Sequence, residues 1–163
     1  MTIFTPKSSK MKAFSSILGV FTLFFAIFSL SACSKSSNTS SASEKDQMIA
    51  YAKANAINYT EDPSGLLYEI TNPGTGAKPS VTNTITVTYA GKLLNGKQFD
   101  AGTITYGLSS LIKGWQIAVP KIGAGGSMKV LIPSSLGYGS QGAGSDIPPN
   151  SPLYFEITLN AVR

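Results

Sequence analysis

"TITVTYAGKLLNGKQFD", residues 84–100, carries the strongest structural signal in the chain. Ile85, Val87 and Tyr89 alternate with threonines, and this period of two is typical of a strand with one buried face. Asn95-Gly96 follows, the residue pair that most strongly favours a tight hairpin turn. The stretch therefore predicts two antiparallel strands joined at this turn.

The turn also predicts which residues lie opposite one another. With a two-residue turn, the residue numbers of cross-strand partners add up to 191 (95 plus 96), which places Tyr89 opposite Gly102. Tyr89 and Asp100 are then diagonal neighbours on one face, close enough for the phenol to donate a hydrogen bond to the carboxylate. The same arithmetic places Phe99 on the other face, unless the strand bulges after the turn.

The segments around this hairpin predict further strands and one short helix. Residues 109–120, "SSLIKGWQIAVP", have helical spacing, with Ser109 or Ser110 as the N-cap and Pro120 at the end. Strands are expected at 66–70, at 127–132 and after residue 152. An antiparallel sheet packed on a helix is the α+β class. The members of the expected apolar faces are Ile112, Trp115 and Val119 on the helix, and Met128, Val130 and Ile132 on a strand.

Residues 137–150, "GYGSQGAGSDIPPN", form a long segment of Gly, Ser and Pro between two expected strands. Loops of this length inside a compact domain are uncommon, and they usually serve as lids or binding loops. We therefore expect this segment to border a functional site.

The N-terminus has the pattern of a secretory signal. Three lysines precede an apolar run at 13–30, which ends in the small residues of "LSAC". "LSAC" resembles the bacterial lipobox, whose Cys becomes the lipidated first residue of the mature protein. A membrane-spanning helix is the alternative, because the run is nearly long enough to cross a bilayer; the lipobox favours the signal. We expect residues 1–32 to be a signal peptide, Cys33 to be lipidated, and the protein to be anchored to a membrane of the bacterial cell envelope.

Removal of this segment changes the composition of the chain. Three of its thirteen basic residues leave with it, so ten basic residues oppose eight acidic ones, a net charge of +2. No basic stripe remains for nucleic-acid binding. The chain has no His, and its single Cys is explained by lipidation, so catalytic triads and His-based metal sites lack their residues.

Residues 33–43 are rich in serine and predict a flexible tether. A short helix is expected over 44–60, with Ser43 as N-cap and acidic residues in its first turn. Ile49, Ala52 and Ala56 share one face of this helix. It could lie on its own domain, fray, or act as a dimerisation arm, and the first two are favoured. The remaining residues, 61–163, suffice for one small core.

Four motifs resemble the successive signatures of FKBP-type peptidyl-prolyl cis–trans isomerases. They are "VTYAGKLLNGKQFD", "LIKGW", "GAGGSMKVLIPSSLGYG" and "IPPNSPLYFEITL", in the family's order and across about residues 65–162. The resemblance implies a half-open antiparallel sheet wrapped around one short helix. It also implies a shallow apolar pocket under the loop 137–150, which binds proline-containing polypeptides without a cofactor. Macrolides of the rapamycin type are further expected ligands.

The resemblance also implies roles for individual residues. The groups assigned to catalysis are Tyr89, Asp100, the Tyr138 hydroxyl and the Ile112 backbone N–H. Those assigned to substrate binding are Phe99, Tyr106, Leu111, Trp115, Ile147 and Phe155, with Trp115 as the pocket floor. Trp115, Tyr89 and Phe155 would also suit an ordinary core.

Two functions follow from this pattern. The first is prolyl isomerisation, which requires desolvation and oriented hydrogen bonds but no covalent step. The second is a non-catalytic chaperone or assembly module that binds proline peptides. The chain has only "AGTIT" between Asp100 and Tyr106, where family members commonly have a longer loop with a basic residue, and this difference favours the second function. The first function is the expected one, because it is favoured by the aromatic set Tyr89, Phe99, Trp115, Tyr138 and Phe155.

Overall fold

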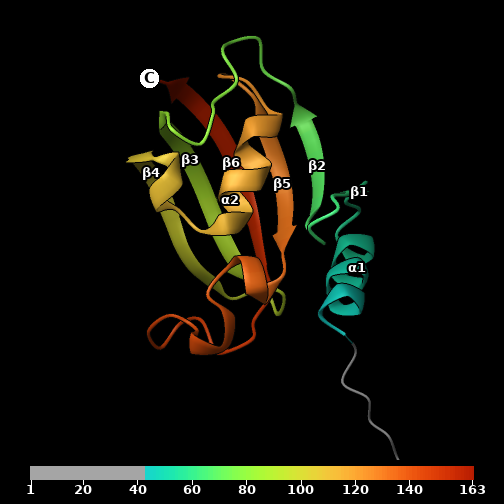
Figure 1. Ribbon diagram of the computed structural model, residues 1–163. Helices are drawn as coiled ribbons and strands as arrows, with labels where there is room; N and C mark the ends of the chain where they lie inside the picture. Colours follow the sequence, from blue (N-terminus) through green and yellow to red (C-terminus); the bar gives the residue numbers. More distant parts are fainter. Residues whose placement is uncertain (1–42) are drawn as a thin grey trace, which may run out of the picture. The chain divides into compact units, whose positions relative to one another are not determined.

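The computed structural model describes residues 43–163, and the expected signal peptide, most of the tether and Cys33 lie outside them. Six antiparallel strands form one open sheet in the order β1-β2-β5-β6-β3-β4. The elements are α1 (Glu44–Ala54), β1 (Thr60–Glu61), β2 (Leu67–Asn72), β3 (Thr84–Leu93), β4 (Gln98–Gly107), α2 (Lys113–Ala118), β5 (Ser127–Ile132) and β6 (Leu153–Val162). Figure 1 shows α2 across one face of the sheet, with β4 and β1 at opposite edges. The predicted α+β fold is confirmed.

The main core lies between α2 and the inner face of the sheet. The alternating strand residues predicted to face inward are buried, apart from the partly buried Tyr89, because successive strand residues point to opposite faces and only one parity meets the helix. Each fully buried apolar side chain of this kind stabilises the fold by about 1.5–3 kcal/mol. The buried members from the predicted faces are Ile85, Val87, Trp115, Val119, Met128, Val130, Ile132 and Phe155.

The turn between β3 and β4 differs from the predicted two-residue turn. The Gly96 N–H donates to the Leu93 carbonyl at 2.9 Å, and the Leu93 N–H donates to the Lys97 carbonyl at 2.9 Å. Gly96 has φ of +88°, a conformation that glycine adopts without steric cost. The loop therefore has three residues and ends in a residue of left-handed conformation, the second common way to close a hairpin.

A bulge after the turn restores the predicted register. Lys92 lies opposite Gln98 and Gly91 lies opposite Asp100, so Phe99 is an extra residue in β4. The additional turn residue and the additional strand residue offset each other. Tyr89 consequently lies opposite Gly102, and this predicted pairing is confirmed although the predicted turn length is wrong.

β4 runs without interruption through the segment "AGTIT", residues 101–105, where the resemblance to the family predicted a shortened loop. Threonines support this strand from its neighbour: Thr86 and Thr105 are joined at 2.9 Å between their hydroxyls, and Thr88 and Thr103 at 2.8 Å. The five residues between Asp100 and Tyr106 leave none for a separate loop, and the segment therefore continues as a strand paired with β3.

α2 begins later than predicted. Its N-cap is Ile112, which lacks a capping side chain, instead of Ser109 or Ser110. The two serines belong to a separate 3₁₀ turn, Leu108–Ser110, in which the Leu111 N–H donates to the Leu108 carbonyl. A second 3₁₀ turn follows α2 and contains Pro120, which agrees with the predicted end.

α1 covers the outer face of the sheet. Met48 and Ala52 are buried against Leu67, Leu131 and Tyr154, which have the strand parity opposite to that of the main core. α1 therefore packs on its own domain, as favoured by the sequence. Within residues 43–163, no helix is long and apolar enough to cross a bilayer.

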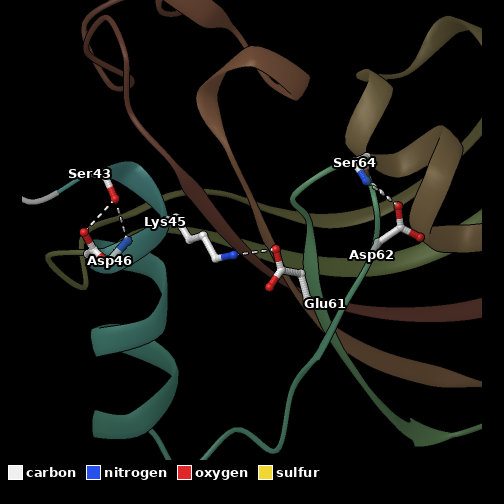
Figure 2. Close-up of polar contacts among 6 residues, drawn as sticks. All are labelled: Ser43, Lys45, Asp46, Glu61, Asp62 and Ser64. Carbon is white, nitrogen blue, oxygen red and sulfur yellow. Dashed lines mark hydrogen bonds and ion pairs between the residues drawn. The ribbon is translucent and has the colours of Figure 1, made fainter.

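The two ends of α1 explain its extent. Figure 2 shows the start, where the Ser43 hydroxyl accepts a hydrogen bond from the Asp46 N–H at 3.2 Å, as predicted. The helix ends at Ala54, before the expected boundary at residue 60, and Ala56 then has φ of 50°. This end exposes Ala56, which the sequence had placed on the buried face.

Polar contacts attach α1 to the domain. The Lys45 ammonium lies 2.7 Å from the Glu61 carboxylate on β1 (Figure 2). The Glu44 carboxylate accepts hydrogen bonds from the Ser134 N–H at 2.7 Å and from the Ser134 hydroxyl at 2.6 Å. Ser134 is buried and lies two residues after the end of β5, so this contact fixes the start of α1 beside the chain that leads into the loop segment 137–150.

The loop segment 137–150 is held by its own hydrogen bonds. It contains a 3₁₀ turn, Gly139–Gln141, and a short bridge in which Ala143 and Ile147 exchange two backbone hydrogen bonds at 2.8 and 3.1 Å. The Lys97 ammonium on the β3–β4 hairpin lies 2.8 Å from Asp146. These contacts define one conformation of a segment that the sequence predicted only as a loop.

Candidate active site

A cavity of about 320 Å³ lies on the inner face of the sheet, next to the start of α2. β3, β4, β6, α2 and the loop segment 137–150 each contribute to it. Its lining residues are Tyr89, Phe99, Asp100, Ile104, Tyr106, Leu111, Ile112, Trp115, Tyr138 and Phe155. The structure therefore brings together all the residues predicted for the proline pocket except Ile147.

Four aromatic rings form the base of the cavity, and we call Tyr89, Phe99, Trp115 and Phe155 the aromatic cradle. The Trp115 and Phe155 rings are 5.4 Å apart at 87°, and the Tyr89 and Trp115 rings are 5.2 Å apart at 82°. The Phe99 and Phe155 rings are 5.5 Å apart at 87°. These edge-to-face arrangements are the favoured ones for aromatic pairs, so the rings of the cradle stabilise one another by packing.

Phe99 reaches the cradle for two local reasons. The bulge in β4 turns its side chain to the inner face, as the resemblance required. Gly91 lies beneath it, and a β-carbon there would come within 2.6 Å of the Phe99 ring and 2.7 Å of the Phe155 ring. Glycine at position 91 therefore leaves the space in which the two rings meet.

Trp115 is 3% exposed, and its indole N–H is buried with no acceptor among residues 43–163. A buried polar group without a partner is rare in native cores, and each such group calls for an explanation. This feature distinguishes Trp115 from an ordinary core residue.

Tyr89 and Asp100 form the pair that the register predicted. The Tyr89 hydroxyl donates to the Asp100 carboxylate at 2.5 Å. Burial, the hydrogen bond to Asp100 and the negative charge of Asp100 together raise the pKa of Tyr89 to about 12. Asp100 itself is exposed, and within the described chain no Lys or Arg forms an ion pair with it. The carboxylate is thus an acceptor that orients the phenol.

Two hydrogen-bond donors at the cavity are unoccupied within residues 43–163. The Tyr138 hydroxyl, from the loop segment 137–150, has no partner there, and the residue is 39% exposed. The Ile112 N–H at the start of α2 also has no acceptor in this part of the chain. Burial raises the pKa of Tyr138, with a smaller contribution from the Asp100 charge, so the phenol retains its proton at neutral pH.

Ile147 does not line the cavity. It is 5% exposed and packs into the main core, because its two backbone bonds to Ala143 direct the loop inward at this point. Ile104 lines the cavity instead and was not predicted. The predicted cross-strand pairing could have identified Ile104, because it lies opposite the buried Val87. Ile104 is also two residues from Gly102, on the same face as Asp100.

The lining offers apolar surface and hydrogen-bond donors. Its titratable groups are one carboxylate and three phenols: Asp100, Tyr89, Tyr106 and Tyr138. A ring of modest size fits on the cradle, and the donors at its border can bind amide carbonyls. The arrangement suits recognition of an apolar residue within a peptide.

Comparisons with known proteins agree with this site. The family model of FKBP-type peptidyl-prolyl cis-trans isomerase matches residues 76–160. A probable FKBP-type peptidyl-prolyl cis-trans isomerase of Haemophilus influenzae is 40% identical over 67% of this chain and 46% of its own length. The outer membrane protein MIP of Legionella longbeachae is 42% identical over 62% of this chain and 46% of its own. The chain thus spans about half the length of each of these relatives.

A solved structure gives the same result for the fold. The crystal structure of a peptidyl-prolyl cis-trans isomerase from Pseudomonas syringae superposes with a TM-score of 0.66 at 36% identity. The match covers 76% of this chain and 95% of that one. The matched family model covers residues 76–160, which include the strands and the helix that build the cavity, and the chain therefore belongs to the FKBP-type peptidyl-prolyl cis–trans isomerase family.

Proposed function

We propose that this protein is a peptidyl-prolyl cis–trans isomerase that binds proline on the aromatic cradle. The observation that carries the proposal is the combination of an apolar aromatic base with two unoccupied donors at its border, the Tyr138 hydroxyl and the Ile112 N–H. The isomerase names of the related proteins support it. No contact among residues 43–163 favours a non-catalytic module over an isomerase.

The reaction needs no nucleophile. The barrier to rotation of a peptide bond is about 18–20 kcal/mol because rotation breaks the amide resonance. The twisted transition state has lost the polarity that this resonance gives the planar amide, so an apolar cavity destabilises it less than it destabilises the ground state. This difference in binding accelerates rotation without a covalent step. An acceleration of 10⁴-fold requires roughly 5.5 kcal/mol of such discrimination.

The residues divide into four roles in this mechanism. Trp115 and Phe155 form the base on which the proline ring lies, and Phe99, Tyr106, Leu111 and Ile104 exclude water around it. The Tyr138 hydroxyl and the Ile112 N–H donate to carbonyls on either side of the rotating bond. Asp100 is a positioning residue, because it acts by holding the Tyr89 phenol.

We further propose a location at the bacterial cell envelope, through a lipid on Cys33. The "LSAC" motif supports this proposal, as does the name of the Legionella relative, an outer membrane protein. Cys33→Ser should release the protein from the membrane fraction or leave it unprocessed. A variant that is processed and sediments with membranes like the parent would contradict lipid anchoring.

The same cavity is proposed to bind macrolides of the rapamycin type, because such ligands also present a ring and carbonyl groups. Competition between a macrolide and a proline peptide, followed through the fluorescence of the single tryptophan, tests this point.

A protease-coupled assay with a short X–Pro peptide tests the isomerase proposal. The purified full chain, kept in detergent, should accelerate isomerisation well above the uncatalysed rate, which takes tens to hundreds of seconds. Phe155→Ala is expected to reduce this rate strongly, and Tyr154→Phe on the outer face is the control. Binding of proline peptides to the parent without turnover would support the non-catalytic module instead.

A further inference from the structure

The edge strand β4 has a free outer side. It is the last strand of the sheet, and among residues 43–163 no strand pairs with its outer edge. The opposite edge is different: β1 has only two residues, one of them Glu61, which is paired with Lys45. Short length and charge are common protections of an edge against pairing with another chain, and β4 has ten residues.

The register shows which backbone groups of β4 point outward. Thr84 on β3 exchanges two hydrogen bonds with Arg163 at 2.8 and 2.9 Å, so its N–H and C=O face β6. Because these directions alternate along a strand, Ile85 and every second residue after it face β4. Their partners in β4 begin with Tyr106 and continue at every second residue toward Asp100.

The alternate residues Ala101, Thr103 and Thr105 therefore direct their N–H and C=O groups to the free edge. All three are exposed. From Ala101 to Gly107 the strand has no charged residue and no proline. An exposed edge of this kind is a template for a further strand.

This edge is held in place before any partner arrives. The hydroxyl pairs Thr88–Thr103 and Thr86–Thr105 attach β4 to β3, and the Asn160 amide donates to the Thr88 hydroxyl at 2.8 Å. An ordered edge loses little conformational freedom when a segment binds to it, which favours binding.

The free edge is continuous with the cavity. Asp100, Ile104 and Tyr106 of β4 line the cavity, and Gly102 lies between them on the same face. Nothing lies within 4 Å of the position that a β-carbon on Gly102 would occupy. Gly102 thus leaves a gap in the border, through which a chain can pass from the cavity to the edge.

We propose that β4 is a second substrate-binding site, at which the segment of a client polypeptide next to the bound proline adds to the sheet as an extended strand. This inference rests on the proposed function, since the proline in the cavity places the segment at the edge. Backbone pairing of this kind does not depend on sequence and suits unfolded clients. The three outward residues span a segment of about five residues, roughly 17 Å.

A comparison of peptide lengths tests this site on the parent protein. A short X–Pro peptide and the same peptide with six added residues, on either the N- or the C-terminal side, are titrated against the fluorescence of Trp115. One of the two long peptides should bind at least about fivefold more tightly than the short one. Alternate N–H groups of a paired strand point to the neighbouring strand, so N-methylation of one alternate set of amides in the extension should remove this gain in affinity. N-methylation of the other set should leave the gain unchanged. Equal affinity of all three peptides would contradict the proposal.

A variant pair tests the edge from the side of the protein. Thr103→Pro removes one outward N–H at a place where the preceding residue is glycine, and Thr103→Val keeps the N–H but also loses the hydroxyl. The affinity ratio of long to short peptide should fall about two- to tenfold in Thr103→Pro relative to Thr103→Val. An unchanged ratio would overturn the proposal.

Two further outcomes are distinguishable. A dimer of the parent in sedimentation equilibrium that Thr103→Pro dissociates would assign the edge to pairing between two copies and overturn the client site. Absence of turnover of the short peptide, with the gain for the long peptide intact, would contradict the isomerase proposal and support the β4 site.

Discussion

The two faces of the sheet are covered in different ways. On the inner face, α2 and the strands bury a continuous core, and the cavity is a part of that core left open at one end. On the outer face, α1 buries a smaller cluster around Met48 and Ala52 and adds polar contacts at Glu44 and Lys45. The same side chains thus build the inner core and the site, whereas the outer cluster contains no site residue.

This difference implies that stability and function are coupled on one face and separable on the other. Aromatic rings that bind substrate also pack against one another, so their removal affects both properties. Contacts of α1 can be changed without altering any residue that lines the cavity. Four predictions test this contrast, and each includes a result that would contradict it.

The largest effect is expected for Trp115→Ala. Trp115 is 3% exposed, and truncation of a buried Trp typically costs about 3–5 kcal/mol in the free energy of unfolding. Urea denaturation should show this loss together with loss of peptide binding. Tyr106→Ala is the control, since Tyr106 lines the same cavity but is 57% exposed, and its cost should stay within about 0.5 kcal/mol. Similar costs for both variants would show that the cavity is not part of the core.

Met48→Ala should lower the free energy of unfolding by about 2 kcal/mol, near the lower end for a buried methionine, because α1 can partly settle into the space. The specificity constant kcat/KM for a short peptide should remain within about twofold of the parent. Ile49→Ala is the matched control, because Ile49 lies next to Met48 but is only partly buried, so its cost should be smaller. A loss of turnover in Met48→Ala with the fold intact would show that the two faces are coupled.

The sequence predicted the inner face better than the outer one. The residues of the inner face follow from the alternation within strands and from the cross-strand pairing in which residue numbers add up to 191. Large aromatic residues also lie mostly in a core. On the outer face the helical spacing selected Ile49, Ala52 and Ala56, of which only Ala52 is buried, and it missed the buried Met48. The side of a short, weakly amphipathic helix that becomes buried is set by the surface on which the helix packs, and that surface exists only in the folded chain.

The errors within the site have specific physical causes. The turn prediction failed because Asn-Gly suits both two- and three-residue loops, and only the bulge at Phe99 makes the longer loop compatible with the pairing of Tyr89 and Gly102. Ile147 was misplaced because a bridge to Ala143 inside a Gly-rich loop leaves no periodic pattern. Ile112 is the helix N-cap instead of a serine, because both predicted serines belong to a separate 3₁₀ turn.

Tyr138→Phe should have a smaller effect, on rate alone. It removes one donor and keeps the ring, which costs about 0.5–1.5 kcal/mol for a neutral hydrogen bond, or some two- to thirteenfold in kcat/KM. The outer face offers a matched phenol: the Tyr154 hydroxyl donates to Glu156 at 2.9 Å, next to α1. Tyr154→Phe should change the free energy of unfolding by a similar amount and leave kcat/KM unchanged. Complete inactivation by Tyr138→Phe, with the unfolding midpoint of the parent, would indicate proton transfer by this phenol.

The smallest expected effect is that of alkaline pH on turnover. Burial, assisted by the hydrogen bond to Asp100, raises the pKa of Tyr89 to about 12, and burial also raises the pKa of Tyr138. A raised pKa means that the proton is retained as the pH rises, so both phenols remain neutral donors beyond pH 10, the ordinary range for Tyr. The value of kcat/KM should therefore be flat from about pH 7 to about pH 10. Asp100→Asn removes the charge but not the burial, so tyrosinate absorbance should appear at lower pH than in the parent, yet still above the ordinary value. A bell-shaped rate profile in the parent would instead require acid–base chemistry, and the separation of a binding face from a purely structural one would then no longer account for catalysis.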